Sequence, residues 1–257
     1  MITNSFDPDS GIIEPAALFA PMEGLPDTCV ITFSKTVLEH ALHQYEHSLA
    51  LSLPGLNGDK PIYRLRHEGF ETLLYMSPIT AAGAGLTLEE VACATGARRF
   101  ILFGSCGALD QQLTEGRLIV PTAAYRDEGL SYHYAPAKDY ITVMNAPFVA
   151  RTLAELGLPH VEGRAWTTDA LYRETRGHLA KRRAEGCIAV DMECAGLQAL
   201  CDFRGYQYYI FFYTGDLLDA PAWERRILDS GSLEADHQLA AFRVALEIAR
   251  RAAGGGT

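Results

Sequence analysis

Apolar residues along the chain follow two patterns. Short continuous runs, of which 99–104 (RFILFG) and 206–214 (YQYYIFFYT) are the most apolar, are typical of buried strands. Longer stretches, such as 86–95 and 233–252, carry apolar residues at helical spacing and predict helices. Further strands are predicted at 29–34, 62–67, 72–77, 117–123, 162–167 and 187–190, and further helices at 36–50, 146–156, 173–185 and 192–203.

The order of these elements predicts the fold class. Strands alternate with helices over the whole chain, which is typical of an α/β protein whose helices flank a central sheet. We therefore expect a single domain with a mixed, mostly parallel sheet. Neither an internal repeat nor a linker divides the sequence, so we place an N-terminal extension at 1–28, one domain at 29–253 and a disordered tail at 254–257.

Composition and charge narrow the range of partners. The net charge of −10 argues against nucleic acid or an anionic membrane as the partner, since both require a basic surface. No apolar run is long enough to span a membrane, and the N-terminus carries no secretory pattern. The six cysteines have no metal-binding spacing, so we expect no metal site and a cytoplasmic protein with free thiols.

Polar residues follow three of the predicted strands, at 104–107 (GSCG), 191–193 (DME) and 214–216 (TGD). Ligands of α/β proteins bind at the carboxyl ends of the strands, so these junctions are candidate sites. The glycines can aim backbone N–H groups at an anion or form a plain tight turn. The carboxylates at 191–193 can bind sugar hydroxyls or cap the next helix. Burial would raise the pKa of Asp216 into the range of a general acid, but Asp216 could equally cap a turn.

Two further segments are candidates for ligand binding. The stretch 125–141 is polar, aromatic and longer than a plain connection needs to be, and Arg126 and its neighbours could hold a base or a sugar. A charged surface loop is the alternative. The cluster 167–169 (TTD), which includes Thr168, could be a site or an ordinary side-chain turn.

In this order, the segments FGSCGAL, PTAAYRDEGLSYHY, TTDALY, AVDMECAGL and TGD resemble motifs of the nucleoside phosphorylase family, which includes uridine phosphorylase and the hexameric purine nucleoside phosphorylases. The resemblance covers about residues 29–212, with Asp216 just beyond. It implies an enzyme that cleaves the N-glycosidic bond of a nucleoside with phosphate, giving free base and ribose 1-phosphate. It also implies no cofactor apart from phosphate as co-substrate, and a homo-oligomer, either a dimer or a hexamer.

The resemblance assigns a role to each matched residue. Asp216 would protonate the leaving base at N7, as in the purine branch of the family. The substrate-binding residues would be Gly104 and Ser105 (phosphate and sugar), Met192 and Glu193 (ribose), and Arg126, Thr168, Leu171 and Arg176 (the remaining contacts, chiefly with the base). Base choice stays open, because Asp216 points to purines whereas the loop of Arg126 is closer to the pyrimidine branch.

The phosphate site departs from the family pattern. Leu102 stands where the family's phosphorylases carry an arginine, and ITFSKTVLEH lacks the usual glycine and arginine after the first strand. A phosphate dianion in a partly dry pocket needs a cation. Three alternatives follow: replacement by Lys35, Arg64, Arg66 or Arg126, hydrolysis by water as in the family's nucleosidases, or a non-catalytic nucleoside-binding protein.

Overall fold

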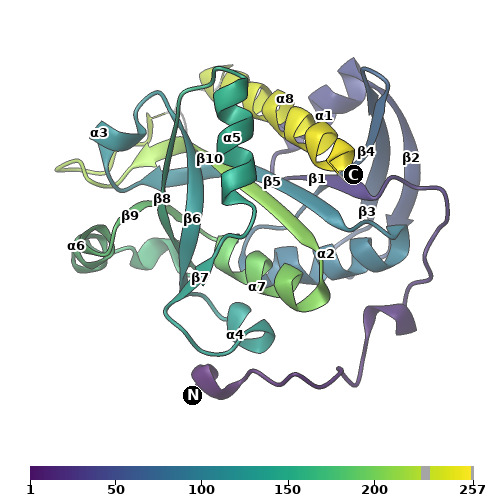
Figure 1. The fold of residues 1–257 in the computed structure, drawn as a ribbon, viewed down its shortest axis with the longest axis horizontal. Coiled ribbons are helices and arrows are strands. Elements are labelled where there is room, and N and C mark those ends of the chain that lie inside the picture. Colours follow the sequence, from purple (N-terminus) through teal and green to yellow (C-terminus); the bar gives the residue numbers. More distant parts are fainter. Residues whose placement is uncertain (227–231, 256–257) are drawn as a thin grey trace.

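A mixed sheet forms the centre of the computed structural model, which describes residues 1–226 and 232–255 (Figure 1). Its ten strands are β1 (Thr28–Thr32), β2 (Glu46–Leu53), β3 (Lys60–His67), β4 (Phe70–Met76), β5 (Arg99–Ala108), β6 (Leu118–Asp127), β7 (Tyr140–Thr142), β8 (His160–Thr168), β9 (Cys187–Asp191) and β10 (Gln207–Leu217). The helices are α1 (Lys35–Gln44), α2 (Ala81–Thr95), α3 (Gln111–Thr114), α4 (Ser131–Tyr134), α5 (Ala146–Glu155), α6 (Arg176–Ala184), α7 (Cys194–Arg204) and α8 (Ser232–Gly254). The α/β class expected from the sequence is confirmed.

Five strands of the sheet close into a ring. The strand order is β10-β6-β8-β9-β5-β1-β4-β3-β2, and an additional pairing joins β10 to β5. Half of the strand pairings are parallel, including the two longest, β10 with β5 and β6 with β8. The sheet is therefore mixed, and β5, which pairs with β1, β9 and β10, lies at its centre.

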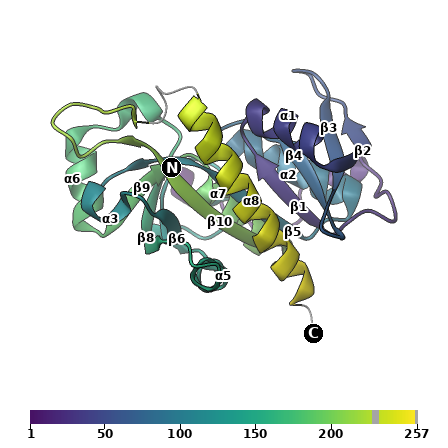
Figure 2. The same ribbon diagram turned by 90° about the horizontal axis from the view of Figure 1, so that it is seen from above.

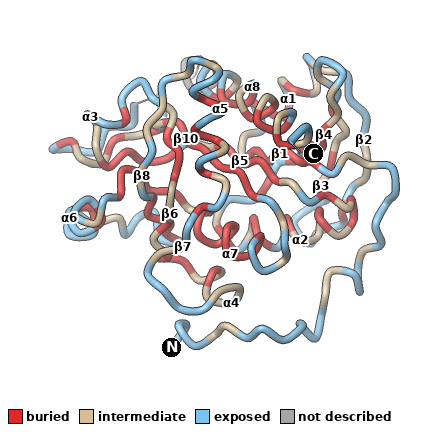
Figure 3. The backbone as a smooth tube through the Cα atoms, in the orientation of Figure 1, coloured by how far each residue is buried: buried red, intermediate tan, exposed pale blue. Residues whose placement is uncertain are grey.

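Helices cover both faces of the sheet. Helices α1, α5 and α8 lie over one face, and α2, α4 and α7 lie over the other (Figure 1). Figure 2 shows α8 crossing the strands obliquely. Buried residues concentrate in β1, β5, β10 and α7 (Figure 3), where apolar side chains meet from both faces.

The helix predicted at 36–50 is wrong after Gln44. Helix α1 ends at Gln44, and Glu46–Leu53 forms β2, an edge strand that pairs antiparallel with β3. The sequence EHSLALSL alternates with a period of two, and the pairing with β3 stabilises the extended conformation that this period allows. The segment 125–141 is also more regular than predicted, because it contains the end of β6, α4 and β7.

The N-terminal segment lies against the outside of α2 and α7. It is mostly exposed, with short 3₁₀ turns at Ile2–Asn4 and Pro15–Ala17. Arg204 in α7 donates a hydrogen bond to Glu14 over 2.8 Å, which attaches the segment to the domain. At the other end, Gly254 is the last residue of α8, and 256–257 of the predicted tail lie outside the described residues. No helix in the described part combines the length and the apolar character needed to cross a membrane.

Candidate functional site

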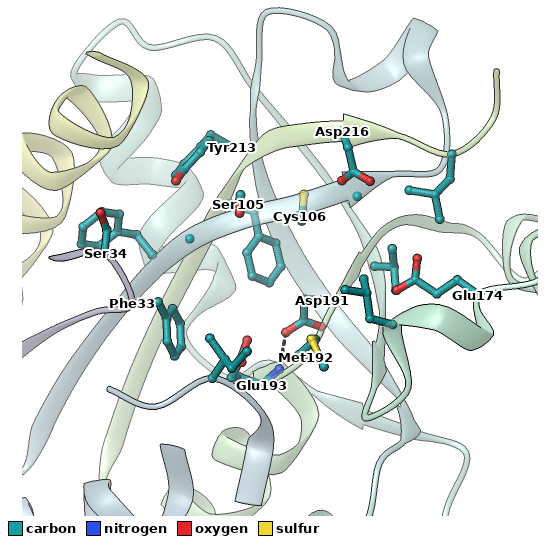
Figure 4. Close-up of a pocket in the computed structure, with 18 of the residues that line it drawn as sticks. Phe33, Ser34, Ser105, Cys106, Glu174, Asp191, Met192, Glu193, Tyr213 and Asp216 are labelled. Atoms are coloured by element: carbon teal, nitrogen blue, oxygen red, sulfur yellow. Dashed lines mark hydrogen bonds between the residues drawn. The ribbon is translucent and has the colours of Figure 1, made fainter. Parts of the chain in front are cut away.

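A cavity of about 890 Å³ opens at the carboxyl ends of β1, β5, β9 and β10 (Figure 4). It brings together seven of the nine residues singled out in the sequence: Gly104, Ser105, Leu171, Arg176, Met192, Glu193 and Asp216. These residues come from four separate stretches of the chain. The cavity therefore lies where α/β proteins bind small molecules, at the ends of the central strands.

The other two residues, Arg126 and Thr168, lie outside the cavity lining. Arg126 is buried, and its guanidinium donates to Ser131 Oγ over 2.8 Å and to the carbonyl oxygens of Ala135 and Pro136. Thr168 Oγ1 accepts a hydrogen bond from the backbone N–H of Ala170 over 3.2 Å. In this structure both side chains order the chain around the site, because their polar atoms bind neighbouring backbone and hydroxyl groups.

A β-bulge at Gly215 sets the direction of the Asp216 side chain. Strand β10 pairs with β5 so that Tyr213 lies beside Ser105 and Asp216 beside Gly107, which leaves Gly215 as an extra residue. Side chains of a regular strand alternate between faces, so residues 213 and 216 would point to opposite faces without the extra residue. The bulge places both side chains in the cavity.

The Asp216 carboxyl group has one hydrogen-bond partner from the loop after β10. The chain beyond Leu217 folds back, pairs Leu217 with Glu224, and brings Trp223 over the carboxyl group. Trp223 Nε1 donates to Asp216 Oδ2 over 2.5 Å. Burial raises the pKa of Asp216 above its ordinary value, while the hydrogen bond from Trp223 opposes this shift.

The Asp191 side chain binds backbone N–H groups at the start of α7, whose N-cap residue is Glu193. Its carboxylate accepts hydrogen bonds from the backbone N–H groups of Glu193 (2.8 Å) and Cys194 (2.6 Å) and from Thr167 Oγ1 (2.7 Å). Burial raises the pKa of Asp191 to about 6, although these hydrogen bonds favour its charged form. The capping interpretation of this carboxylate therefore holds for Asp191.

Glu193 connects the β9–α7 junction to α2. Its Oε1 accepts a hydrogen bond over 2.7 Å from the backbone N–H of Thr80, the N-cap residue of α2, which has a φ of +76°. The side chain is buried beside Met192 and Asp191, with 8% of the residue exposed. Burial, and then the neighbouring charge of Asp191, raise the pKa of Glu193 to about 8. At neutral pH this group can therefore donate as well as accept a hydrogen bond.

Hydroxyl groups line the end of the cavity near α1 and α8. Ser34 caps α1 by accepting a hydrogen bond from Val37 N over 3.3 Å, and its own hydroxyl donates to Gln238 of α8. Ser105 and Thr36 lie in the same lining. Neutral donors therefore gather at this end, while the carboxyl groups of Asp216 and Glu174 lie toward the other (Figure 4).

Carboxyl groups outnumber basic side chains in the lining. Among its described residues, four carry carboxyl groups, and Arg176 is the only basic one. The guanidinium of Arg176 already donates to the carbonyl oxygens of Leu218 (2.9 Å) and Pro221 (2.8 Å). A buried leucine, Leu102, occupies the position where the sequence comparison expected an arginine.

The basic residues considered as replacements for that arginine do not line the cavity. Lys35 is exposed and pairs with Glu39 over 3.4 Å. Arg64 binds the carbonyl oxygen of Gly24 and lies 3.6 Å from Glu71, and Arg66 pairs with the same glutamate over 2.9 Å. Among the residues that the structure describes, none of these basic side chains takes the place of the missing arginine.

Several lining residues escaped the sequence analysis, among them Glu174, Tyr213 and Trp223. Tyr213 belongs to a strand predicted as core, and Trp223 follows it in a loop without a motif. Glu174 sits in a charged stretch, RETRGH, that has the composition of an exposed helix start. The sequence did hold one signal for this part of the site. Gly215 lies inside an apolar strand, and a glycine in that position often marks a bulge.

The mixed sheet and the carboxyl-lined cavity at its strand ends define an α/β protein whose cavity lies where proteins of this class bind small molecules. The chain belongs to the phosphorylase superfamily, whose sequence profile matches residues 28–249. The resemblance to nucleoside phosphorylases drawn from the sequence motifs is thereby confirmed.

Individual relatives are distant. The chain is 26% identical over 154 residues to a guanosine phosphorylase of Halorubrum lacusprofundi, covering 58% of this chain and 62% of that protein. It is 26% identical over 176 residues to the uridine phosphorylase of Escherichia coli K12, covering 57% and 68%. It is also 24% identical to an uncharacterised mimivirus protein, R802, over 65% of that protein's length. This chain therefore spans less than two thirds of the length of the mimivirus protein and of the Halorubrum protein.

A solved structure supports the fold. The crystal structure of uridine phosphorylase from Vibrio fischeri ES114 superposes with a TM-score of 0.75, covering 95% of this chain and all of the other. Sequence identity over this superposition is 16%, so the similarity concerns the architecture alone.

Proposed function

We propose that this chain cleaves the N-glycosidic bond of a nucleoside and that water, not phosphate, accepts the sugar. The observation that carries the proposal is the set of ionisable groups in the cavity: carboxyl groups at both the base and ribose positions, and Arg176, bound to two backbone carbonyl oxygens, as the only basic side chain among the described lining residues.

The two ends of the bond require different groups. Cleavage passes through a state with positive charge on the sugar and negative charge on the base, so the base needs a proton donor. Asp216, whose pKa is raised by burial, is the candidate for that role. Glu193 and Met192 lie across the cavity from it, where the family places the ribose (Figure 4). The Glu193 carboxyl group would bind the ribose hydroxyls, and Met192 would pack against the sugar.

Electrostatics favour water over phosphate as the group that accepts the sugar. A phosphate dianion in this cavity would lie near four carboxyl groups, and Arg176, the one basic residue of the described lining, already directs two of its donors at backbone carbonyl oxygens. Water carries no such penalty. The hydroxyl groups of Ser34, Thr36 and Ser105 can hold a water molecule on the face of the sugar opposite the base.

Phosphorolysis is the second candidate. It is favoured by the relatives named as phosphorylases and by the same hydroxyl groups, which could donate to phosphate oxygens. The positive charge for phosphate would then have to come from outside the described lining.

One assay separates the candidates. The purified protein is incubated with a panel of purine and pyrimidine nucleosides, with and without phosphate, and the free base and the sugar product are identified by chromatography. Hydrolysis is supported if free base and ribose are released as fast without phosphate as with it. Strict dependence on phosphate with ribose 1-phosphate as product overturns it in favour of phosphorolysis. Absence of cleavage for every nucleoside overturns the enzymatic proposal and leaves a binding protein.

A further inference from the structure

Thr80, the N-cap residue of α2, has a backbone conformation that is unusual for its side chain. Its φ of +76° and ψ of 145° lie near a region that only glycine adopts readily, and a β-branched residue with a positive φ is strained. A threonine at the start of a helix usually has a negative φ and caps the helix with its hydroxyl group, but the Thr80 side chain makes no capping bond. Contacts with the rest of the molecule must therefore hold this conformation.

Two contacts hold the start of α2 in place. The backbone N–H of Thr80 donates to Glu193 Oε1 over 2.7 Å. In addition, the first turn of α2 packs directly on the first turn of α7: a Cβ on Gly196 would lie 2.6 Å from the Cβ of Ala81, which is fully buried. Because Gly196 has no Cβ, α2 comes close enough to α7 for the N–H of Thr80 to reach the carboxyl group.

The contact with Thr80 fixes a carboxyl group of the cavity. Glu193 lines the cavity together with Ile79, the residue that precedes Thr80. The backbone of Glu193 is fixed as well, because its N–H donates to Asp191 Oδ2 over 2.8 Å. With Oε1 bound to Thr80, the second oxygen, Oε2, is left for a ligand. A carboxyl group held in this way is already ordered before the ligand arrives, which lowers the cost of binding.

We propose that Thr80 is a positioning residue for the sugar: its backbone N–H holds Glu193 Oε1 so that Oε2 binds a ribose hydroxyl group. The assignment rests on the proposed function, because it takes Glu193 as the group that binds the ribose. It adds the residue that sets the direction of this carboxyl group, and it gives the strained backbone a role. Loss of the Thr80 bond should therefore weaken only those ligands that carry ribose hydroxyl groups.

The test compares nucleosides with and without these hydroxyl groups. Binding of adenosine, uridine and their 2′,3′-dideoxy counterparts is measured by calorimetry, and kcat/KM is measured wherever cleavage occurs. Wild type should bind the ribonucleosides more tightly by on the order of 10- to 100-fold, as expected for hydrogen bonds to a carboxyl group. An ester bond at position 80, introduced with the α-hydroxy analogue of threonine, removes the N–H of Thr80 and keeps its side chain. This variant should lower the ribose preference about tenfold.

A second variant separates the two helix starts without changing Thr80. Gly196→Ala adds a methyl group that overlaps Ala81, so the ribose preference should fall about tenfold. Gly196→Ala combined with Ala81→Gly removes the opposing methyl group and should restore the preference. The matched control is Gly163→Ala in β8, outside the cavity lining, where the new Cβ would lie 2.6 Å from Ile188 Cδ1. This equal overlap should lower stability and leave the ribose preference unchanged.

A wild-type preference in the ester variant, or an equal loss in Gly163→Ala, overturns the positioning role. The two proposals fail separately. If wild type cleaves nucleosides and the ester variant keeps the ribose preference, cleavage stands and the role of Thr80 is wrong. If wild type cleaves no nucleoside but the ester variant loses the preference in binding, the enzymatic proposal fails and Thr80 still positions Glu193. Equal binding of ribonucleosides and dideoxynucleosides by wild type overturns the positioning role, and no binding of any of the four overturns both proposals.

Discussion

Trp223 Nε1 donates a hydrogen bond to Asp216 Oδ2 over 2.5 Å, from a loop that folds back over the end of β10. This bond stabilises the charged form of Asp216 and so opposes the rise in pKa that burial causes. The loop and the bulge at Gly215 therefore act on the same carboxyl group: the bulge directs it into the cavity, and the indole sets how readily it holds a proton.

Replacing Trp223 with phenylalanine should raise the pKa of Asp216 further, because the ring remains while the N–H donor is lost. If Asp216 acts as an acid, activity requires its protonated form, so the basic limb of the kcat/KM profile should move to higher pH. Steady-state measurements from pH 5 to pH 9 check this. A limb that stays in place or moves to lower pH would show that the indole does not control the active carboxyl group.

Asp216→Asn should lower turnover of nucleosides by about 10²- to 10⁴-fold, the usual contribution of a general acid. The effect should depend on the leaving group. A p-nitrophenyl riboside releases a stable anion that needs no proton, so its cleavage should fall far less. The comparison uses kcat for both substrates with wild type and variant. An equal loss on both would assign Asp216 a structural role instead.

The sequence predicted the strand-end location of the site because apolar runs and polar junctions are local features. The run at 99–104 lies in β5, all but the first residue of the run at 206–214 lies in β10, and GSCG, DME and TGD all reach the cavity. The location follows once parallel strands are adjacent, since their carboxyl ends meet at one edge.

The remaining features depend on tertiary contacts that no local pattern records. Glu174 enters the cavity because the turn at Leu171–Arg173 directs it there, whereas its neighbours in sequence suggest a solvated helix start. Arg126 stands in a charged motif but is enclosed by the carbonyl groups of its own loop. In the same way, residues 46–50 of β2 were predicted as helix because the extended form of this strand depends on pairing with β3.

The raised pKa of Glu193 also predicts how stability changes with pH. The folded protein binds this proton up to about pH 8, while the unfolded chain releases it near the ordinary value of 4.5. Between these values the native state holds more protons, so the free energy of unfolding should fall as pH rises, by up to about 1.4 kcal/mol per pH unit. Asp191 and Glu174 contribute slopes of the same sign.

Urea unfolding at pH 5, 6.5 and 8 measures this slope. Glu193→Gln keeps an oxygen for the N–H of Thr80 and removes the titrating group, so its slope should be smaller than that of wild type. A variant with an unchanged slope would show that Glu193 is already ionised in the folded protein at neutral pH.

Two glycines of β5 provide a matched pair for testing how tightly the cavity floor is packed. A Cβ at Gly107 would lie 2.5 Å from Leu218 Cδ1, 2.8 Å from Val190 Cγ1 and 3.3 Å from Asp216 Oδ1. Gly107→Ala should therefore lower the free energy of unfolding by about 1–3 kcal/mol and reduce turnover, because relief of the overlap displaces the Asp216 carboxyl group. A Cβ at Gly104 would meet only Phe33, at 3.6 Å, which is ordinary contact. Gly104→Ala should therefore retain wild-type stability or gain up to about 1 kcal/mol from the less flexible unfolded chain. Chemical denaturation of both variants checks the contrast, and similar unfolding energies for the two would show that β5 can shift away from Val190 and Leu218 without cost.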